Sequence, residues 1–311
     1  MRVLLALGGN AMTAADGSAR PEDQIAAARV AAGAVAGLLA RDHDVVITHG
    51  NGPQVGNLLV KNELAAAVVP PVGLDWCGAQ TQGTLGFVLT TALDAALTAA
   101  GVDRRTAAVV TRTRVAADDP GLLRPSKPVG RHLPADEAAV LVAHGQTWQD
   151  RGERGWRRMV ASLEPLEIVD GPAIRALVDA GFVVVGNGGG GIPVVRLPGG
   201  ELAGVEAVID KDLGAALFAR TVGADVLVIG TDVPHAVLHF GTPAAEPLSR
   251  IGVEKLRAHA ADGHFAGGSM GPKVDAACRF VENGGTRAVI TDLTHITEAV
   301  TGDAGTVVVP S

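Results

Sequence analysis

Three lysines lie in segments that could hold a phosphate group. The chain has 26 basic residues, and only five of them are lysine. Three of the five, Lys127, Lys211 and Lys273, occur in the segments RPSKPVG, VIDKDL and GSMGPKV. An ammonium group is a compact point charge on a flexible stem, whereas a guanidinium is a planar fork. We therefore expect these lysines to follow a moving phosphoryl group, with chance placement as the alternative that composition leaves open.

A glycine-rich loop precedes Lys211. The apolar run Phe182–Val185 leads into Gly186–Gly191, and Asp210-Lys211-Asp212 begins a helix predicted over Leu213–Val222. Successive glycines are costly to order, so they are expected where bare backbone approaches a ligand. A helix N-terminus also attracts anions. Asp210 is expected to cap this helix. A second loop, Gly267–Gly271, leads into a helix at Pro272 and places Lys273 near another N-terminus.

Two familiar phosphate motifs do not fit. Gly186, Gly188 and Gly191 satisfy G-x-G-x-x-G, but Ile192–Val195 continues as a strand, whereas a dinucleotide loop must begin a helix. In the Walker pattern Gly271 would have to precede the lysine directly, and Pro272 intervenes. The sequence therefore predicts a phosphate site of another design and disfavours a dehydrogenase.

The elements that position these residues follow a strand–loop–helix rhythm. Buried strands are predicted at Val3–Leu7 and Asp44–Thr48, each ending in a glycine turn, and the helices that follow begin at Pro21 and Pro53. This is the pattern of a parallel α/β sheet, in which ligands bind beyond the carboxyl ends of the strands. The turns at 8–10, 50–52 and 186–191 would meet at that edge. Asn10 and Asn51 are then substrate contacts or simple turn residues, and His49 is a supporting residue rather than a base.

Two stretches depart from this rhythm. Residues 113–160 contain four prolines and little periodicity, so we expect them to form an inserted, lid-like subdomain that carries Lys127. A long helix is predicted over Leu74–Ala100, interrupted at 80–83 and at Gly86. Asp232 follows a predicted strand and is either a turn residue or a nucleotide contact.

Composition excludes several classes of protein. Hydrophobic residues make up 47% of the 311 residues and charged residues 19%, which excludes a disordered chain. The net charge of −7 gives no general attraction for nucleic acid or anionic membranes. Cys77 and Cys278 show no metal or disulfide spacing, and no signal peptide or membrane span is evident. We expect a protein of the reducing cytoplasm.

Several segments together resemble the carbamate kinase family of the amino acid kinase superfamily. The resemblance covers nearly the whole chain and is carried by ALGGNAM at 6–12, THGNGPQVGNL at 48–58, QTQGTLGF at 80–87, SKPVG at 126–130, RRMVAS at 157–162, GNGGGGIPV at 186–194, VEAVIDKDL at 205–213, TDV at 231–233 and GHFAGGSMGPKVDAACRFVENGG at 263–285. Three features depart from the family pattern: Arg131-His132 after the Lys127 segment, Asn187 where a cysteine or similar residue is usual, and the absence of tyrosine.

The resemblance implies a fold and a reaction. The fold is a three-layer αβα sandwich on a mostly parallel sheet of about eight strands, with a small protruding subdomain and a homodimeric assembly. The reaction is reversible phosphoryl transfer between ATP and carbamate, with Mg²⁺, used to make ATP in arginine or related nitrogen catabolism. Carbamate is already an anion at neutral pH and needs no general base, so alignment and charge neutralisation suffice.

The resemblance also implies residue roles. The amino-terminal part would bind carbamate and the part from about 205 to 311 the nucleotide. The small acid would be held by backbone groups of Gly9, Asn10, Gly50, Asn51 and Gly52. Lys127 would close over it, while Asp210 would hold Lys211 and Lys273 at the transferring phosphoryl group. Nucleotide contacts would come from Lys211, Asp232, Met270, Gly271 and Lys273, and no metal ligand is assigned to the protein.

Two alternatives remain open at the level of sequence. A related amino acid kinase that acts on another small carboxylate would share the glycine loops. A non-catalytic nucleotide-binding protein of the same fold would also share them, although the three lysines weigh against it.

Overall fold

The computed structural model describes residues 1–8, 12–13, 20–265 and 270–311. At its centre is an eight-stranded sheet with the order β16-β18-β17-β13-β1-β2-β9-β3. In that order the strands are Arg250–Gly252, Thr306–Val309, Arg287–Asp292, Val226–Thr231, Arg2–Leu7, Asp44–His49, Val183–Val185 and Thr106–Ala108. Within this sheet β17 and β18 pair antiparallel, and all other neighbouring strands pair parallel. The predicted mostly parallel sheet of about eight strands is confirmed.

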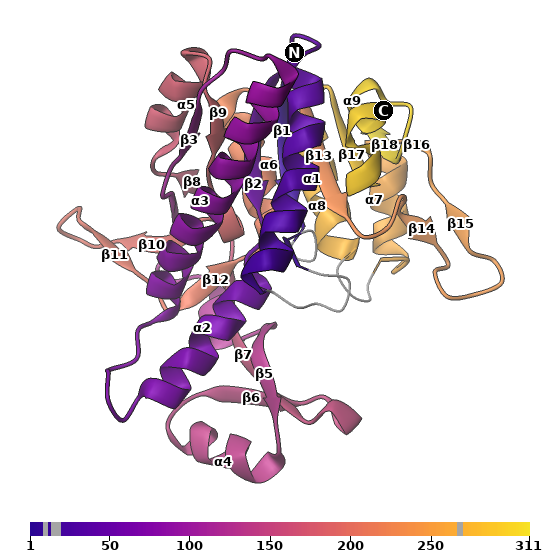
Figure 1. The fold of residues 1–311 in the computed structure, drawn as a ribbon. Coiled ribbons are helices and arrows are strands. Elements are labelled where there is room, and N and C mark those ends of the chain that lie inside the picture. The colour runs from indigo at the N-terminus through magenta and orange to yellow at the C-terminus, as the bar shows by residue number, and fades with distance from the viewer. Residues whose placement is uncertain (9–11, 14–19, 266–269) are drawn as a thin grey trace.

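Helices cover both faces of this sheet, which makes three layers (Figure 1). Side chains alternate along β1, so Val3, Leu5 and Leu7 belong to one core and Leu4 and Ala6 to the other. The first core is covered by α1 (Pro21–Leu39), α3 (Leu74–Ala100) and α9 (Ile296–Thr301). The second is covered by α5 (Gly171–Asp179), α6 (Lys211–Val222), α7 (Val253–Ala261) and α8 (Met270–Glu282).

Helix α3 runs without the predicted interruptions. Its buried residues Leu85, Leu89, Leu93 and Leu97 recur every fourth position and pack on the sheet. Gly86 lies so close to β3 that a Cβ there would be 2.8 Å from the Cβ of Ala108. The prediction of breaks at 80–83 and at Gly86 was wrong, because close packing, rather than a bend, requires the small residue. Among the described residues α3 is the one helix that matches a membrane span by length and composition.

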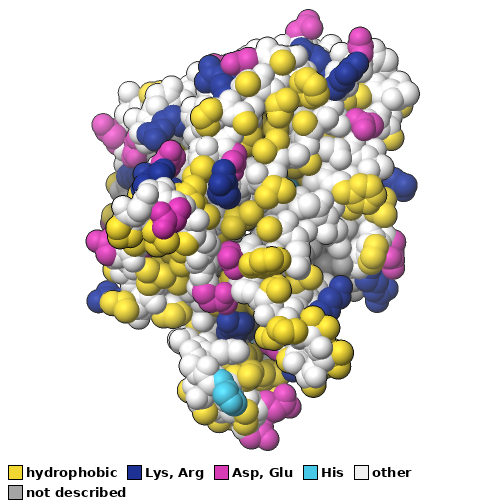
Figure 2. All heavy atoms as spheres, turned by 90° about the vertical axis from the view of Figure 1, so that its left-hand side faces the viewer, with side chains coloured by type: hydrophobic (Ala, Val, Ile, Leu, Met, Phe, Trp, Pro, Cys, Tyr) yellow, Lys and Arg dark blue, Asp and Glu magenta, His cyan; other side chains and the backbone are white. Residues whose placement is uncertain are grey.

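The outer side of α3 is apolar as well. Trp76 and Phe87 are exposed and lie eleven residues apart, which is about three helical turns, so they point the same way. Hydrophobic side chains gather on this face of the molecule (Figure 2).

Residues 113–160 lie outside the main sheet, and most of them form a small body that projects from it (Figure 1). Its sheet has the order β12-β7-β5, and β6 also pairs with β7. The strands are β5 (Lys127–Leu133), β6 (Thr147–Asp150), β7 (Trp156–Leu163) and β12 (Ala207–Ile209), with α4 (Ala135–Ala143) beside them. Strand β7 continues to Leu163 and connects this body to β12.

The remaining elements are short apart from one helix. A second four-stranded sheet has the order β11-β10-β4-β8, and β14 pairs with β15. The bounds are α2 (Gly52–Ala65), β4 (Arg112–Arg114), β8 (Glu167–Ile168), β10 (Ile192–Arg196), β11 (Leu202–Gly204), β14 (Val237–Leu238) and β15 (Glu246–Pro247), with single 3₁₀ turns at Pro120–Leu123, Gly152–Arg154, Gly188–Gly190 and Leu293–His295.

The glycine turn Gly188–Gly190 is anchored by Asn187. This residue is fully buried and has φ 53°, in the left-handed region. Its backbone N–H donates to Thr111 Oγ1 (3.0 Å), its carbonyl accepts from Thr48 Oγ1 (2.9 Å), and its amide Nδ2 donates to the carbonyl of Gly214 in α6 (3.1 Å). Asparagine tolerates this backbone region better than most residues. Asn187 therefore joins the end of β9 to the first turns of α6.

His49, the last residue of β2, packs against this turn. Its ring fills the space where a Cβ at Gly188 would lie, and its Nδ1 is 3.0 Å from the carbonyl of Gly50. Burial lowers the pKa of His49 to about 4, the hydrogen bond to Gly50 opposes this, and Lys211 adds to it. His49 is thus a neutral packing residue, in line with the supporting role expected from the sequence.

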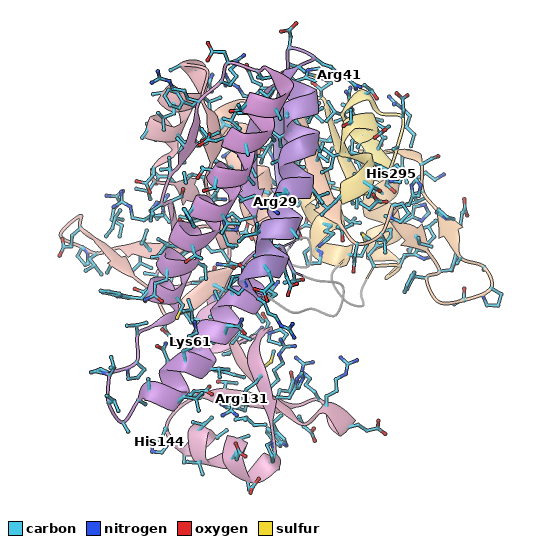
Figure 3. The ribbon with its side chains drawn as sticks, in the orientation of Figure 1. Arg29, Arg41, Lys61, Arg131, His144 and His295 are labelled. Carbon is cyan, nitrogen blue, oxygen red and sulfur yellow. The ribbon has the colours of Figure 1, made fainter. Side chains whose placement is uncertain are left out.

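We predict that His49 contributes to acid sensitivity. The folded pKa of His49 lies below the ordinary value of 6.5, so on acidification the unfolded chain takes up a proton at a higher pH than the folded protein does. The contribution of His49 to stability is therefore complete above about pH 6.5 and falls as the pH decreases towards 4. By linkage the loss between pH 7 and pH 5 is about 2 kcal/mol. Urea unfolding of His49→Gln at the two pH values should show a smaller drop than wild type. His144→Gln, on the projecting body (Figure 3), is the control; an unchanged drop in His49→Gln would contradict the prediction.

Candidate active site

The three lysines converge on one pocket. Lys127, Lys211 and Lys273 line a cavity of about 330 Å³ together with Asp210 and Asp212. They come from three separate elements, because Lys127 is the first residue of β5, Lys211 the first of α6, and Lys273 lies in the first turn of α8. The structure thus brings together groups that lie 146 residues apart at the extremes of the sequence (127 to 273). The cavity is the size of a small-molecule site.

The N-terminus of α6 organises the charges. Asp210 caps this helix as predicted, since its Oδ1 accepts a hydrogen bond from the backbone N–H of Asp212 (2.9 Å). Its other oxygen, Oδ2, lies 2.6 Å from Lys127 Nζ. One carboxylate therefore satisfies the helix end and holds the lysine of the projecting body.

Asp212 is the carboxylate that bridges the other two lysines. Its Oδ1 lies 2.7 Å from Lys211 Nζ and its Oδ2 lies 3.1 Å from Lys273 Nζ. The prediction that Asp210 pairs with Lys211 and Lys273 was therefore wrong, because Asp212 is the aspartate that contacts both lysines. Asp210 still favours the charged form of Lys211 through space. The sequence offered a signal for Asp212, since Lys211 stands between the two aspartates.

The ion pairs that Asp212 makes are almost completely buried. Asp212 is 3% exposed and Lys273 6% exposed. Burial disfavours ionisation of Asp212, but Lys211 and Lys273 together hold its pKa below the ordinary value. Burial lowers the pKa of Lys211, Asp212 opposes this, and Lys273 lowers it further. Asp212 therefore opposes the effect of burial on Lys211, in a site that would otherwise favour loss of its proton.

Lys211 keeps hydrogen-bonding capacity. Its Nζ is buried, and within the described chain it makes no hydrogen bond, since the contact with Asp212 has ion-pair distance but not hydrogen-bond geometry. An ammonium group has three donors. A buried donor without an acceptor costs free energy, so an anionic oxygen in the pocket would relieve that cost.

The turn at 50–52 also lines the pocket. Gly50, Asn51 and Gly52 all contribute, where β2 ends and α2 begins. The amide of Asn51 does not cap α2; its Nδ2 donates to Thr81 Oγ1 (2.9 Å) and lies over Gly189. Gly189 has φ 68°, and any Cβ there would collide with Asn51. The start of α2 thus lines the pocket, and a helix N-terminus favours anions.

Sequence reasoning missed two supporting residues. Asn187 was noted only as a departure from a family pattern, yet it ties the glycine turn to α6. Gln82 in α3 also supports this turn, since its Nε2 donates to the carbonyls of Gly188 (2.9 Å) and Thr111 (3.1 Å). A buried glutamine on an apolar helix face was the available signal.

The remaining predicted residues lie elsewhere. Gly9 and Asn10 fall outside the described residues. Asp232 is exposed after β13, where it accepts a hydrogen bond from Thr231 Oγ1 (3.0 Å). Met270 and Gly271 begin α8, but Pro272 and Lys273 are the residues of this segment that line the pocket. The nucleotide contacts assigned to Asp232, Met270 and Gly271 stay predictions.

Comparison with known proteins identifies relatives over the full length. Residues 1–292 match the model of the amino acid kinase family. The chain is 43% identical to a carbamate kinase of Pyrococcus furiosus, with 99% of each chain covered. It is 42% identical to a carbamate kinase-like protein of Escherichia coli K12, with 98% of this chain and 97% of the relative covered.

A solved structure agrees with these matches. The carbamate kinase from Giardia lamblia bound to AMP-PNP superposes with a TM-score of 0.94 at 38% identity, covering 100% of this chain and 98% of the other. The chain therefore belongs to the amino acid kinase family and, within it, to the carbamate kinases and their carbamate kinase-like relatives, so it is a phosphotransferase.

Proposed function

We propose that the protein is a carbamate kinase, which transfers a phosphoryl group reversibly between ATP and carbamate to give ADP and carbamoyl phosphate. The observation that carries this proposal is the convergence of three ammonium groups on one small pocket faced by the start of α2. The names of its full-length relatives support it. We place the enzyme in the cytoplasm, where it makes ATP from carbamoyl phosphate in arginine or related nitrogen catabolism.

The pocket suits this reaction because carbamate loses no proton when it attacks, so the site needs no general base. Carbamate attacks as an anion, and the transferring group carries negative charge at every stage. His49, which packs against the glycine turn, does not line the pocket, and its pKa is lowered to about 4, so it would be a weak base. The protein's task is to align two anions and to neutralise their charge.

Each part of the pocket then has a role. The backbone of Gly50, Asn51 and Gly52 holds carbamate, together with Gly9 and Asn10. Lys127 closes on the substrate from the projecting body of residues 113–160. Lys211 and Lys273 contact the transferring phosphoryl group and the nucleotide phosphates, Asp212 pairs with both of them, and Asp210 positions Lys127. The part from about 205 to 311, with Asp232, Met270 and Gly271, binds the nucleotide.

Mg²⁺ enters this proposal as a companion of ATP. No group of three or more His, Cys, Asp or Glu residues in the described chain could hold a metal ion. The two carboxylates of the pocket are already paired with lysines. Mg²⁺ commonly binds through substrate phosphates with few protein ligands, and a bound ion would supply charge neutralisation on those phosphates.

We also propose that two copies associate through the outer side of α3. Trp76 and Phe87 are 62% and 67% exposed on this side. Helix α3 packs beside β3, which is an edge strand of the main sheet. Large apolar side chains on a surface that ends in an open strand edge are typical of an interface between subunits.

The first prediction concerns turnover. The purified protein should form ATP from ADP and carbamoyl phosphate, and Lys211→Ala should lower kcat by about 10²- to 10³-fold because a group that stabilises transferring charge is lost. Lys255→Ala, on the exposed side of α7, should be unaffected. A coupled ATP assay measures both, with circular dichroism to confirm folding.

The same assay separates the alternatives. ADP release with N-acetylglutamate or aspartate, but not with carbamate, would favour a related amino acid kinase. Binding of ATP without any turnover would favour a non-catalytic protein.

The second prediction concerns Asp212. Asp212→Asn keeps the shape but removes the charge that raises the pKa of Lys211. Lys211 should then lose its proton at lower pH, so the alkaline limb of the kcat profile should move to lower pH and activity should partly recover on acidification. Asp210→Asn is the comparison: Asp210 has a weaker effect on the pKa of Lys211 than Asp212 has, so the alkaline limb should move less, and the variant should mainly raise KM through Lys127. Equal alkaline limbs in Asp212→Asn and wild type would contradict this role.

The third prediction concerns assembly. Sedimentation equilibrium should give about twice the chain mass of 31.5 kDa. Phe87→Glu should shift the protein towards the monomer, because it would bury a charge in the interface. Phe240→Glu, at a phenylalanine on the β14–β15 segment that is more exposed than Phe87, should leave the dimer intact; a dimer that survives Phe87→Glu would exclude this face.

A further inference from the structure

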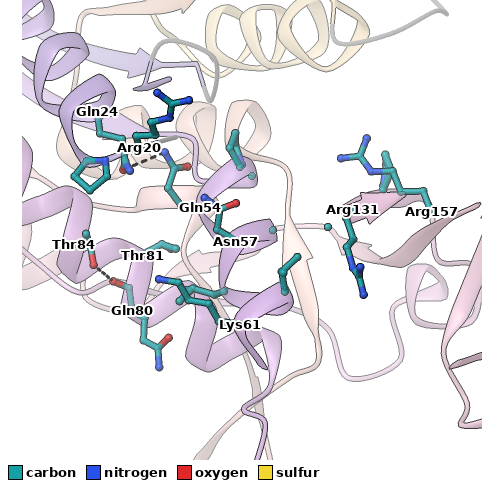
Figure 4. Close-up of a pocket in the computed structure, with 18 residues that line it drawn as sticks. Arg20, Gln24, Gln54, Asn57, Lys61, Gln80, Thr81, Thr84, Arg131 and Arg157 are labelled. Atoms are coloured by element: carbon teal, nitrogen blue, oxygen red, sulfur yellow. Dashed lines mark hydrogen bonds between the residues drawn. The ribbon is translucent and has the colours of Figure 1, made fainter. Parts of the chain in front are cut away.

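A second, larger cleft adjoins the transfer pocket. Its volume is about 980 Å³, and it lies between the helices α1, α2 and α3 on one side and the projecting body on the other (Figure 4). It shares Gly52, Pro53 and Pro128 with the transfer pocket but contains none of the three catalytic lysines. Its volume is at the upper end of the range of small-molecule sites.

The charged side chains that line the cleft are all basic. Arg20 and Lys61 project from the helices, whereas Arg131 and Arg157 project from the body opposite (Figures 3 and 4). No carboxylate lines the cleft in the described chain. In a protein with a net charge of −7, four basic groups around one cavity without an acidic one are an unusual concentration of positive charge.

Most of this charge is uncompensated. Arg131 is paired with Glu63, 3.1 Å from its Nε. No carboxylate among the described residues pairs with the other three basic groups, Arg20, Lys61 and Arg157. Many other arginines of the described chain do form ion pairs with carboxylates. The Nε of Arg157 is buried without an acceptor in the described chain, and burial together with Arg151 and Arg154 lowers the pKa of this guanidinium. An anion would relieve both the repulsion and the missing hydrogen bond.

The cleft also offers neutral hydrogen-bonding groups. Asn57 and Gln80 line it with amides, and Thr81 and Thr84 with hydroxyl groups. Such groups can bind the oxygens of an organic anion as well as its hydroxyl groups. Cations on two facing walls, with polar groups between them, suit a molecule that has anionic groups at both ends.

We propose that this cleft binds a small organic anion with two or more carboxylate or phosphate groups, at a site separate from the transfer pocket. One end of the anion is held by Arg20 and Lys61, and the other by Arg131 and Arg157. Because β5 carries both Lys127 and Arg131, the bound anion also links the core helices to the strand that supplies a catalytic lysine.

Titration calorimetry at low ionic strength tests this proposal with citrate as the carboxylate probe and fructose 1,6-bisphosphate as the phosphate probe. Wild type should bind at least one of them, and acetate, with a single charge, should not bind at the same concentration. The double variant Arg20→Gln/Lys61→Gln should weaken binding about tenfold or more. Both side chains are exposed, so folding should be retained, and a thermal melt checks this.

Two controls locate the site. Lys255→Gln removes one distant surface charge and should bind as wild type does. Lys211→Ala alters the transfer pocket and should also retain binding. The proposal is overturned if neither probe binds wild type, if the double variant binds unchanged, if acetate binds as tightly, or if Lys211→Ala loses the affinity instead. These measurements involve no turnover, so their outcome is independent of the proposed kinase reaction.

Discussion

Two ammonium groups share one buried carboxylate at the positive end of α6. Lys211 and Lys273 repel one another, burial disfavours their charge, and the helix dipole adds to the repulsion. Asp212 offsets these three effects by contacting both. A buried charge without its partner costs several kcal/mol, so the arrangement persists only where the fold brings α6 and α8 together. The capacity of the pocket to attract phosphate depends on this balance.

The glycine turn determines where α6 begins. Gly214 has no side chain, and a Cβ there would lie 2.7 Å from the Cα of Gly190, so the helix and the turn are in direct backbone contact. Asn187 connects the two through its hydrogen bond to the carbonyl of Gly214. The glycines therefore serve close packing as much as ligand approach. They allow the charged end of a helix to lie directly beside the backbone of a turn that lines the pocket.

Basic side chains line two adjoining cavities of this acidic protein. The transfer pocket holds three lysines with two balancing aspartates, whereas the adjoining cleft holds four basic groups without a carboxylate lining it in the described chain. The difference is chemical as well as electrostatic. In the roles that we propose, ammonium groups lie where a phosphoryl group moves, and mostly guanidinium groups lie where an anion is held in place, which matches the geometry of each group.

The sequence by itself determined the sheet, the edge at which the turns at 50–52 and 186–191 meet, the cap at Asp210 and the three lysines. These depend on local signals, namely apolar runs, glycine turns, helix starts and the rarity of lysine. The tertiary structure decided which carboxylate meets which lysine, whether α3 is continuous, and that arginines from the core and the projecting body line one cleft. The reason is physical: Asp212 and Lys273 are 61 residues apart, and the distance between their charged atoms depends on how α6 and α8 pack, which no local pattern encodes.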